Sequence, residues 1–351
     1  MSVTLESQLD APYVFVPGPM LDCDWRSKLG GADALAYNEW VVNSPSGHFA
    51  QTRGWTDVAS LGRPFRSVFV LVRHRASGQL LGCAHVLRCR VGPLALPYAI
   101  IDRGPVVQAP KDLSSVLPAI VHAARRRGIA YLVVMPYWAE KDCATATSAL
   151  EELGFRNVQK PDGAHCATLR LAVAGRPDEG LLHGPQAAKA RREMHAAQRL
   201  GVVAQRSDFE GFDLLAQLHR CAMRAQGRKW KSQDWFRAIR GAFSPGHSTQ
   251  AAAFVTRFEG RALAVVLAIK HGRLVTYVNG SSIHESMPFS KTTPAMLEAI
   301  KWARDEGCDF DLGGIPAPSD VDEKRKSIAQ FKFGFGGTHT NLLGAYARWL
   351  W

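Results

Sequence analysis

The chain contains SVFVLVRHRASGQLLGCAHVL at residues 67–87 and AAAFVTRFEGRALAVVLAI at residues 251–269. In each stretch, apolar residues run on both sides of a short turn, ASG at 76–78 and EG at 259–260. Apolar runs on both sides of a glycine-containing turn predict two antiparallel strands joined as a β-hairpin. The sequence therefore predicts the same supersecondary unit twice.

A helix and a buried strand follow each hairpin. The chain reads LPAIVHAARRRGIAYLVVMP at residues 117–136 and TPAMLEAIKWARDEGCDFDLGG at residues 293–314. Apolar residues at helical spacing that end at Gly128 and Gly307 predict helices that stop there. Two copies of hairpin, helix and strand, about 180 residues apart, indicate a tandem duplication of an α+β domain.

We predict two similar domains, each a mixed, mostly antiparallel sheet flanked by helices. Between the copies lies VAGRPDEGLLHGP at residues 173–185, a glycine- and proline-rich linker. This linker places the first domain at residues 1–175 and the second at residues 176–351. No long heptad array is present, so we expect no coiled-coil arm.

The composition is that of a globular protein, with 46% hydrophobic and 21% charged residues. Seven cysteines without a C-x-x-C pair favour a reducing compartment over a disulfide scaffold. No signal peptide is visible, and the longest aliphatic run, residues 262–269, is far shorter than the ~20 residues that span a bilayer. We therefore expect a soluble, cytoplasmic protein.

The chain has 43 Lys and Arg against 31 Asp and Glu, which gives a net charge of +12. Such an excess favours polyanionic partners: RNA, DNA, nucleotide-linked substrates or the anionic headgroups of lipids. The lipid alternative would be a peripheral membrane contact. A charge that serves solubility alone explains the excess equally well.

Several catalytic motifs are absent, among them G-x-x-x-x-G-K-[ST], G-x-S-x-G and H-E-x-x-H. RRRGIA at residues 125–130 resembles the phosphate-binding signature of acyl-CoA acetyltransferases, but it ends a helix instead of starting one. We interpret it as a basic helix end with a glycine cap. Cys83, His85 and Cys89 share one strand face, yet a zinc site needs a fourth ligand, so we expect no metal.

Two segments contain polar residues that could take part in catalysis or binding. Asp102 and Arg103 follow the apolar strand 96–101, where functional residues often lie, although a turn-capping Asp paired with Arg103 explains the pattern equally well. Lys332 lies in FKFGFGG at residues 331–337, and a Lys between two aromatic rings is partly desolvated. Such a Lys can hold a phosphate or stabilise an oxyanion. The alternative is a surface Lys whose stem packs on the rings.

The chain resembles the FemABX-like peptidyltransferases, which use aminoacyl-tRNA to add amino acids to peptidoglycan precursors. Four segments carry the resemblance, in order through both halves: SPSGHFAQTRGW (44–55), DRGPVVQ (102–108), RREMHAAQRLGV (191–202) and DFDLGGIP…IAQFKFGFGG (309–337). The resemblance implies two tandem acetyltransferase-like (GNAT) domains. It also implies attack of an acceptor amine on an aminoacyl-tRNA ester, with aminoacyl-tRNA as co-substrate and no cofactor.

The resemblance assigns roles to individual residues. Lys332 would stabilise the oxyanion, Phe331 would shape the donor channel and Arg192 would help hold an anionic acceptor. The chain departs from peptidoglycan-acting members at three positions, where an acidic residue, a Lys and an aromatic residue are replaced by Gln108, Ala59 and Ala196. These departures concern the acceptor, and they leave Asp102 as the candidate for taking the acceptor's proton. The acceptor could also lose that proton to the substrate or to water.

We therefore predict an aminoacyltransferase that forms an amide on a peptide, a cell-wall precursor or a small natural-product molecule. The acceptor would contact the first domain at Gln51, Trp55, Asp102 and Arg103. The aminoacyl end of the tRNA would reach the second domain at Lys332, Gly336 and Tyr277.

The tRNA would contact a basic, aromatic segment, RKWKSQDWFRAIR at residues 228–240. Basic side chains bind phosphates, and tryptophans stack on bases. The candidate tRNA-binding residues are Arg228, Lys229, Lys231 and Arg237. An amphipathic helix with a solvated basic face explains the segment at least as well.

Two other functions stay open. One is a GNAT-type N-acyltransferase that uses an acyl-CoA or acyl-carrier thioester, which would need a pyrophosphate-binding loop. The other is a non-catalytic RNA-binding or peptidoglycan-assembly partner. The oligomeric state has no signature in the sequence.

Overall fold

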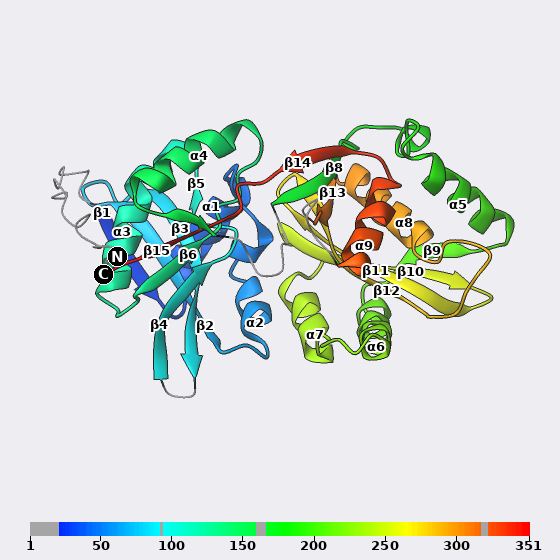
Figure 1. Ribbon diagram of the computed structural model, residues 1–351, viewed down its shortest axis with the longest axis horizontal. Coiled ribbons are helices and arrows are strands. Elements are labelled where there is room, and N and C mark those ends of the chain that lie inside the picture. Colours follow the sequence, from blue (N-terminus) through cyan, green and yellow to red (C-terminus); the bar gives the residue numbers. More distant parts are fainter. Residues whose placement is uncertain (1–20, 92–93, 159–165, 317–321) are drawn as a thin grey trace, which may run out of the picture.

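The computed structural model describes residues 21–91, 94–158, 166–316 and 322–351. An eight-stranded and a seven-stranded sheet lie side by side, and helices pack on both (Figure 1). Each sheet is mixed and mostly antiparallel. The predicted α+β fold with two similar units is therefore confirmed.

The first sheet has the strand order β1-β2-β3-β4-β6-β15-β7, and β5 pairs with β3. Its strands are β1 (Leu21–Arg26), β2 (Phe65–His74), β3 (Leu80–Val91), β4 (Leu94–Ile101), β5 (Val106–Val107), β6 (Tyr131–Val134), β7 (Arg156–Val158) and β15 (Ala345–Trp349). The helices of this half are α1 (Gly31–Asn43), η1 (Phe49–Gln51), α2 (Trp55–Ser60), η2 (Pro110–Asp112), α3 (Leu113–Arg125) and α4 (Lys141–Glu152).

The second sheet has the strand order β14-β8-β13-β12-β11-β10-β9. Its strands are β8 (Ala167–Leu171), β9 (Val203–Arg206), β10 (Thr249–Phe258), β11 (Arg261–His271), β12 (Leu274–Ser282), β13 (Asp309–Gly314) and β14 (Thr338–Asn341). The helices are η3 (Asp178–Gly180), α5 (Ala188–Arg199), α6 (Glu210–Ala225), α7 (Gln233–Ala242), α8 (Thr293–Asp305) and α9 (Glu323–Phe333).

The two halves repeat one order of elements. In the first, β2, β3 and β4 are followed by α3 and β6; in the second, β10, β11 and β12 are followed by α8 and β13. The strand after the helix joins its sheet parallel to the third strand in both halves. The helix stops occur where predicted, since Gly128 and Gly307 both adopt a positive φ. The predicted duplication is thus visible as a repeated topology.

The sequences of β10 and β11 are continuously apolar because helices cover both faces of these strands. On one face of the sheet, Phe254 packs in a cluster with Met296 of α8. On the other face, Val255 packs with Phe212 of α6 and Phe236 of α7. A strand covered on both faces is apolar at every position, so these strands form the centre of the second half.

Two strands exchange between the halves. β8 pairs antiparallel with β13 and β14 of the second sheet, and β15 pairs antiparallel with β6 and β7 of the first. Residues 167–171 of the predicted first domain thus contribute to the second sheet, and residues 345–349 contribute to the first. Local periodicity predicts a strand but not its distant partner. The division at residues 175 and 176 stays a prediction.

The chain crosses from β14 to β15 through residues 342–344 (red in Figure 1). The Glu140 carboxylate accepts a hydrogen bond from the Asn341 N–H at 2.6 Å, and the Glu140 N–H donates to the Asn341 carbonyl at 3.1 Å. The Leu343 N–H donates to the Trp138 carbonyl at 3.0 Å. These bonds fasten the crossing segment to the loop between β6 and α4.

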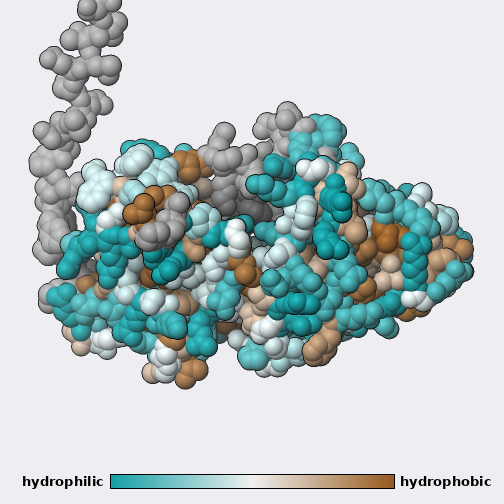
Figure 2. Space-filling model, turned by 90° about the horizontal axis from the view of Figure 1, so that it is seen from below, coloured by the Kyte–Doolittle hydropathy of each residue, from teal (hydrophilic) through white to brown (hydrophobic). Residues whose placement is uncertain are grey.

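In the part of the chain that the structure describes, no helix has the length and apolar character needed to cross a membrane. The longest, α6, has 16 residues, so these residues contain no long helical arm. The face seen from below is mostly hydrophilic, with small separate hydrophobic patches (Figure 2). Peripheral contact with anionic lipid stays a prediction.

The end of β15 offers a test of the strand exchange. Leu350 is fully buried in the core of the first half, whereas its neighbour Trp351 is 75% exposed. We expect Leu350→Ala to lower the free energy of unfolding by about 2–5 kcal/mol because it leaves a cavity in that core. Chemical denaturation measures the loss, with Trp351→Ala as the matched control. Equal, small effects of both changes would contradict the pairing.

Candidate functional site

A cavity of about 470 Å³ lies between the two halves. The first half contributes mainly aromatic and charged side chains: His48, Phe49, Trp55, Asp102, Arg103 and Tyr137. The second half contributes Thr168, Lys231, Trp235, Tyr277, Asn279, Asp311, Gly313, Gly314 and Lys332, among others. Four of the predicted acceptor and donor residues therefore meet here with the predicted catalytic Lys: Trp55, Asp102, Arg103 and Tyr277.

Trp55 joins the two halves at one wall of the cavity. Its ring lies nearly parallel to that of Phe243, with centroids 6.2 Å apart, and edge-on to Trp235 at 6.2 Å. Phe49 of the first half packs against it at 5.1 Å. Trp55 begins α2, while Phe243 and Trp235 belong to the α7 region. Aromatic contacts between α2 and the α7 region thus form this wall, and Trp55 and Trp235 line the cavity.

Asp102 follows β4 in a turn that Gln51 holds in place. Gln51 is fully buried; its amide donates to the Asp102 carbonyl, and its side-chain oxygen accepts from the His85 N–H at 2.7 Å. A Cβ on Gly104 would lie 2.7 Å from the Gln51 side chain, so this close approach requires glycine. Gln51, predicted as a substrate contact, is not among the cavity-lining residues. It fixes the turn that directs Asp102 and Arg103 toward the cavity.

Lys332 lies in the last turn of α9 and is only 6% exposed. Its ammonium donates to the Gly314 carbonyl at 2.8 Å and lies 5.7 Å from the ring centroid of Tyr277. Burial lowers the pKa of Lys332 to about 8, although the Asp311 carboxylate acts in the opposite direction. Burial also raises the pKa of Tyr277 to about 12, so this phenol stays neutral. Lys332 therefore presents a desolvated ammonium to the cavity.

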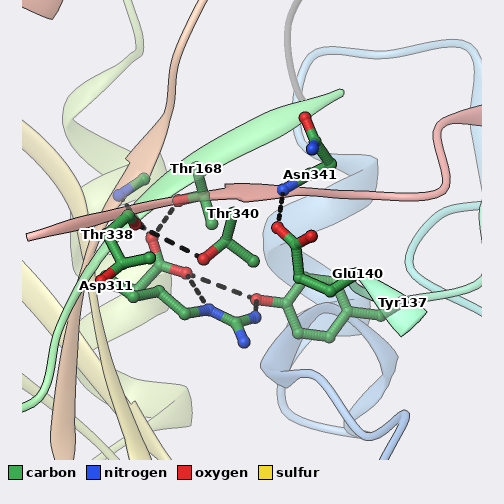
Figure 3. Close-up of polar contacts among 9 residues, drawn as sticks. Tyr137, Glu140, Thr168, Asp311, Thr338, Thr340 and Asn341 are labelled. Carbon is green, nitrogen blue, oxygen red and sulfur yellow. Dashed lines mark hydrogen bonds and ion pairs between the residues drawn. The ribbon is translucent and has the colours of Figure 1, made fainter. Parts of the chain in front are cut away.

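Asp311 connects the second half to the first (Figure 3). Its carboxylate accepts hydrogen bonds from the Thr168 hydroxyl and from the Tyr137 hydroxyl, the latter at 3.4 Å. Arg170 of β8 donates to the Tyr137 oxygen at 2.9 Å and approaches Asp311 at 3.4 Å. Arg103 lies 5.3 Å from the centroid of the Tyr137 ring. Burial, followed by the charge of Asp311, raises the pKa of Tyr137.

Besides Gln51, three predicted substrate-binding residues lie outside this cavity. Arg192 is exposed on α5, at the end of the second half that is remote from the first (Figure 1). Phe331 packs on Phe335 at 5.1 Å and lines a separate pocket. Gly336 is buried, and a Cβ there would approach Ala187 of the second half at 3.8 Å. The structure does not bring these three together with Lys332 in the shared cavity.

The basic segment is partly neutralised by acidic neighbours. Arg228 pairs with Asp322 at 2.9 Å, and Arg237 pairs with Asp213 at 3.4 Å. Lys229 is exposed. Lys231 lines the cavity and lies 5.1 Å from the ring centroid of Trp235; burial, then the charge of Arg63, lowers its pKa. Of the four predicted tRNA contacts, Lys231 is thus the one that reaches the cavity.

The other patterns weighed in the sequence have structural roles. His85 is buried, its ring nitrogens contact the Ala50 carbonyl and the Ser67 hydroxyl, and burial lowers its pKa to about 4. Cys83 is a buried free thiol. The described residues contain no group of three or more His, Cys, Asp and Glu side chains that could hold a metal. Residues 125–130 end α3 and lead into β6.

The four polar residues of the network around Asp311 were not predicted: Tyr137, Thr168, Arg170 and Asp311 itself. Asp311 carried a signal, because a charged residue inside an otherwise apolar strand must find partners when buried. Tyr137 also follows a buried strand, as Asp102 does. Thr168 and Arg170 had no local signal because the pairing of β8 with β13 brings them to Asp311.

Two similar mixed sheets that share a cavity define a tandem GNAT-like fold. Residues 186–325 match the model described as Acetyltransferase (GNAT) domain. The chain is 25% identical over 321 residues to the UDP-N-acetylmuramoylpentapeptide-lysine N(6)-alanyltransferase of Weissella viridescens, covering 85% of this chain and 88% of the relative.

Solved structures agree in fold. The crystal structure of FemX matches with a TM-score of 0.75 and 18% identity, over 91% of this chain and 96% of that one. A tandem GNAT protein from the clavulanic acid biosynthesis pathway matches with a TM-score of 0.52 and 11% identity, over 94% and 99%. With the alanyltransferase match, these findings confirm the predicted resemblance to FemABX-like transferases and the predicted fold of two GNAT-like units.

The role of Gln51 can be tested directly. We expect Gln51→Ala to lower the free energy of unfolding by about 1–3 kcal/mol, because it leaves buried backbone groups of His85 and Asp102 without partners. Chemical denaturation measures this loss. Gln108→Ala is the control, because Gln108 is an exposed glutamine shortly after the turn whose amide donates to the Ser44 hydroxyl rather than to a buried backbone group, and we expect it to stay within about 0.5 kcal/mol. A silent Gln51→Ala would refute the positioning role.

Proposed function

We propose that the protein moves an amino acid from aminoacyl-tRNA to an amine of a peptidoglycan-precursor peptide, or of a related small acceptor, in the cytoplasm. The observation that carries the proposal is the desolvated Lys332 ammonium at 2.8 Å from the Gly314 carbonyl, in a cavity that both halves line. The name of the Weissella relative, an alanyltransferase that acts on a peptide lysine, supports the donor and acceptor chemistry.

The reaction exchanges one bond for another. The acceptor nitrogen attacks the ester carbonyl, a C–N bond forms and the C–O bond to the tRNA ribose breaks. One proton leaves the amine, and one proton ends on the released ribose hydroxyl. An amide is more stable than an ester, so no ATP is required, and the protein must chiefly position the substrates and stabilise the oxyanion. No cofactor takes part in this scheme.

Lys332 and Asp102 suit the two charges that develop. A Lys332 ammonium in a water-poor cavity stabilises the negative carbonyl oxygen far better than it would in water. Asp102 extends from the opposite half, where its carboxylate can bind a cationic amine and take its proton. The aromatic rings of Trp55 and Tyr137 line the same cavity. Each half thus serves one substrate.

The start of α8 disfavours an acyl-CoA donor. Such a donor needs free N–H groups at a helix start to bind its pyrophosphate. Here Ser290 Oγ accepts from the Thr293 N–H at 3.3 Å, and Thr256 Oγ1 accepts from the Ala295 N–H at 3.2 Å. The Glu193 carboxylate accepts from the Thr293 hydroxyl at 2.6 Å, and its negative charge would repel a pyrophosphate. This arrangement supports aminoacyl-tRNA as the donor.

Incubation with a pool of charged tRNAs and candidate acceptors tests the proposal. We expect mass spectrometry to detect an acceptor that has gained one amino-acid residue, and no product when the tRNAs are uncharged. A parallel reaction with acetyl-CoA is the control. Saturable acetyl transfer without any effect of charged tRNA would overturn the proposal, as would RNA binding without product.

Lys332 predicts a dependence on pH. Lys332→Met should lower kcat about 10²–10³-fold, the usual effect of losing one oxyanion donor, while Lys326→Met on the exposed side of the same helix should change it little. Because Lys332 loses its proton as the pH rises through about 8, the advantage of wild type over Lys332→Met should shrink above that pH. A ratio of the two rates that is constant with pH would contradict this role.

A further inference from the structure

Asp311 is a charged residue in an unusual place. It lies on β13 between Phe310 and Leu312, two residues of the hydrophobic core, and it is only 2% exposed. A buried carboxylate costs several kcal/mol unless its charge is compensated. Its oxygens therefore collect hydrogen bonds from separate segments of the chain, and no part of the oxyanion chemistry requires them directly.

One of these bonds links Asp311 to the peptide that holds Lys332. The Gly313 N–H donates to Asp311 Oδ1 at 2.6 Å, and the adjacent Gly314 carbonyl accepts from the Lys332 ammonium at 2.8 Å. Gly313 has φ +76°, and a Cβ there would lie 3.0 Å from the Tyr277 carbonyl and 3.6 Å from the Lys332 ammonium. Consecutive residues of one turn thus contact Asp311 and Lys332.

A second link is electrostatic. Burial disfavours the protonated form of Lys332, and the negative charge of Asp311 is the opposing influence that favours it. A lysine that must be protonated to stabilise an oxyanion gains from a carboxylate that is near but not in contact. Direct contact would compensate the positive charge and weaken its attraction for an oxyanion.

A third link reaches the other half of the molecule. The Tyr137 hydroxyl donates to Asp311, and the guanidinium groups of Arg103 and Arg170 lie 5.3 and 5.7 Å from the centroid of the Tyr137 ring. Arg103 belongs to the turn that also carries Asp102. The Tyr137 phenol therefore connects the Arg103 side of the cavity to Asp311; Figure 3 shows its bond to the Asp311 carboxylate.

We infer that Asp311 is a positioning residue for Lys332: it fixes the Gly313–Gly314 turn that receives the ammonium and supplies the charge that keeps the ammonium protonated. The role rests on the proposed function of Lys332. Asp311 itself does not touch the reacting atoms.

The test compares two aspartates of one strand. Asp311→Asn keeps the shape of the side chain and removes its charge, whereas Asp309→Asn changes a carboxylate that accepts from the Val173 N–H outside the cavity. We expect Asp311→Asn to lower kcat about tenfold to a hundredfold, the equivalent of one hydrogen bond to a charged group, with little change in KM for the donor. Asp309→Asn should leave kcat near that of wild type.

The titration of Lys332 is measured separately, by amine labelling with acetic anhydride across pH and mass spectrometry. The midpoint should move to lower pH in Asp311→Asn and stay in place in Asp309→Asn. This measurement needs no turnover, so it separates the two proposals. A shifted midpoint in a protein that transfers no amino acid would sink the proposed function and spare the positioning role. An unmoved midpoint would overturn the positioning role.

A second pair of variants keeps the test valid if Asp311→Asn fails to fold. Thr168→Val removes one hydrogen-bond donor to Asp311. Thr340→Val is the control: Thr340 pairs with Thr168 across the strands, but its hydroxyl donates to the Thr338 carbonyl and not to Asp311. We expect Thr168→Val to lower kcat severalfold more than Thr340→Val, at equal folding stability. Equal kcat values in the two variants would overturn the inference.

Discussion

The pairing of β15 with β6 fixes the two halves of the molecule relative to each other. The chain that forms β14 in the second sheet continues into the first sheet, and its crossing segment is bonded to the loop between β6 and α4. Backbone hydrogen bonds therefore bridge the halves beside the cavity, and aromatic contacts between α2 and α7 bridge them at another wall. A cavity whose walls come from both halves keeps its shape only under such a constraint.

The duplication explains where the chemistry lies. In each half, the helix returns the chain to a strand that runs parallel to the third strand of the repeat. Asp102 and Tyr137 follow this parallel pair in the first half, and Tyr277 and Asp311 belong to the equivalent pair in the second. The cavity thus forms where the equivalent strand pairs of the two halves approach each other. The first half contributes the Asp102 carboxylate to it, and the second half contributes the Lys332 ammonium.

The sequence predicted what depends on local pattern. Apolar runs, turns and glycine stops located the hairpins and the helices. The strand-end position of Asp102 and the FKFGFGG segment around Lys332 indicated residues on both sides of the cavity, although the ring beside the Lys332 ammonium is that of Tyr277 and not of a flanking phenylalanine. Long-range pairing decided the rest. Arg170 and Thr168 reach Asp311 only because β8 joins the second sheet. Gln51 is buried and supports a turn, but no local sequence pattern shows whether a glutamine in this loop is buried or exposed. Phe331 and Gly336 are close to Lys332 in sequence, but the helix and the turn direct them elsewhere.

Strand β15 also has a consequence for biosynthesis. The ribosome synthesises the chain from the N-terminus, so the other strands of the first sheet emerge long before residues 345–349 do. Until then, β6 has an unpaired edge, and exposed strand edges invite pairing with other chains. The first half, although synthesised early, completes its sheet only after the second half has been made. Folding of this protein is therefore coupled across its whole length, and the two copies of one ancestral unit are no longer independent folding units.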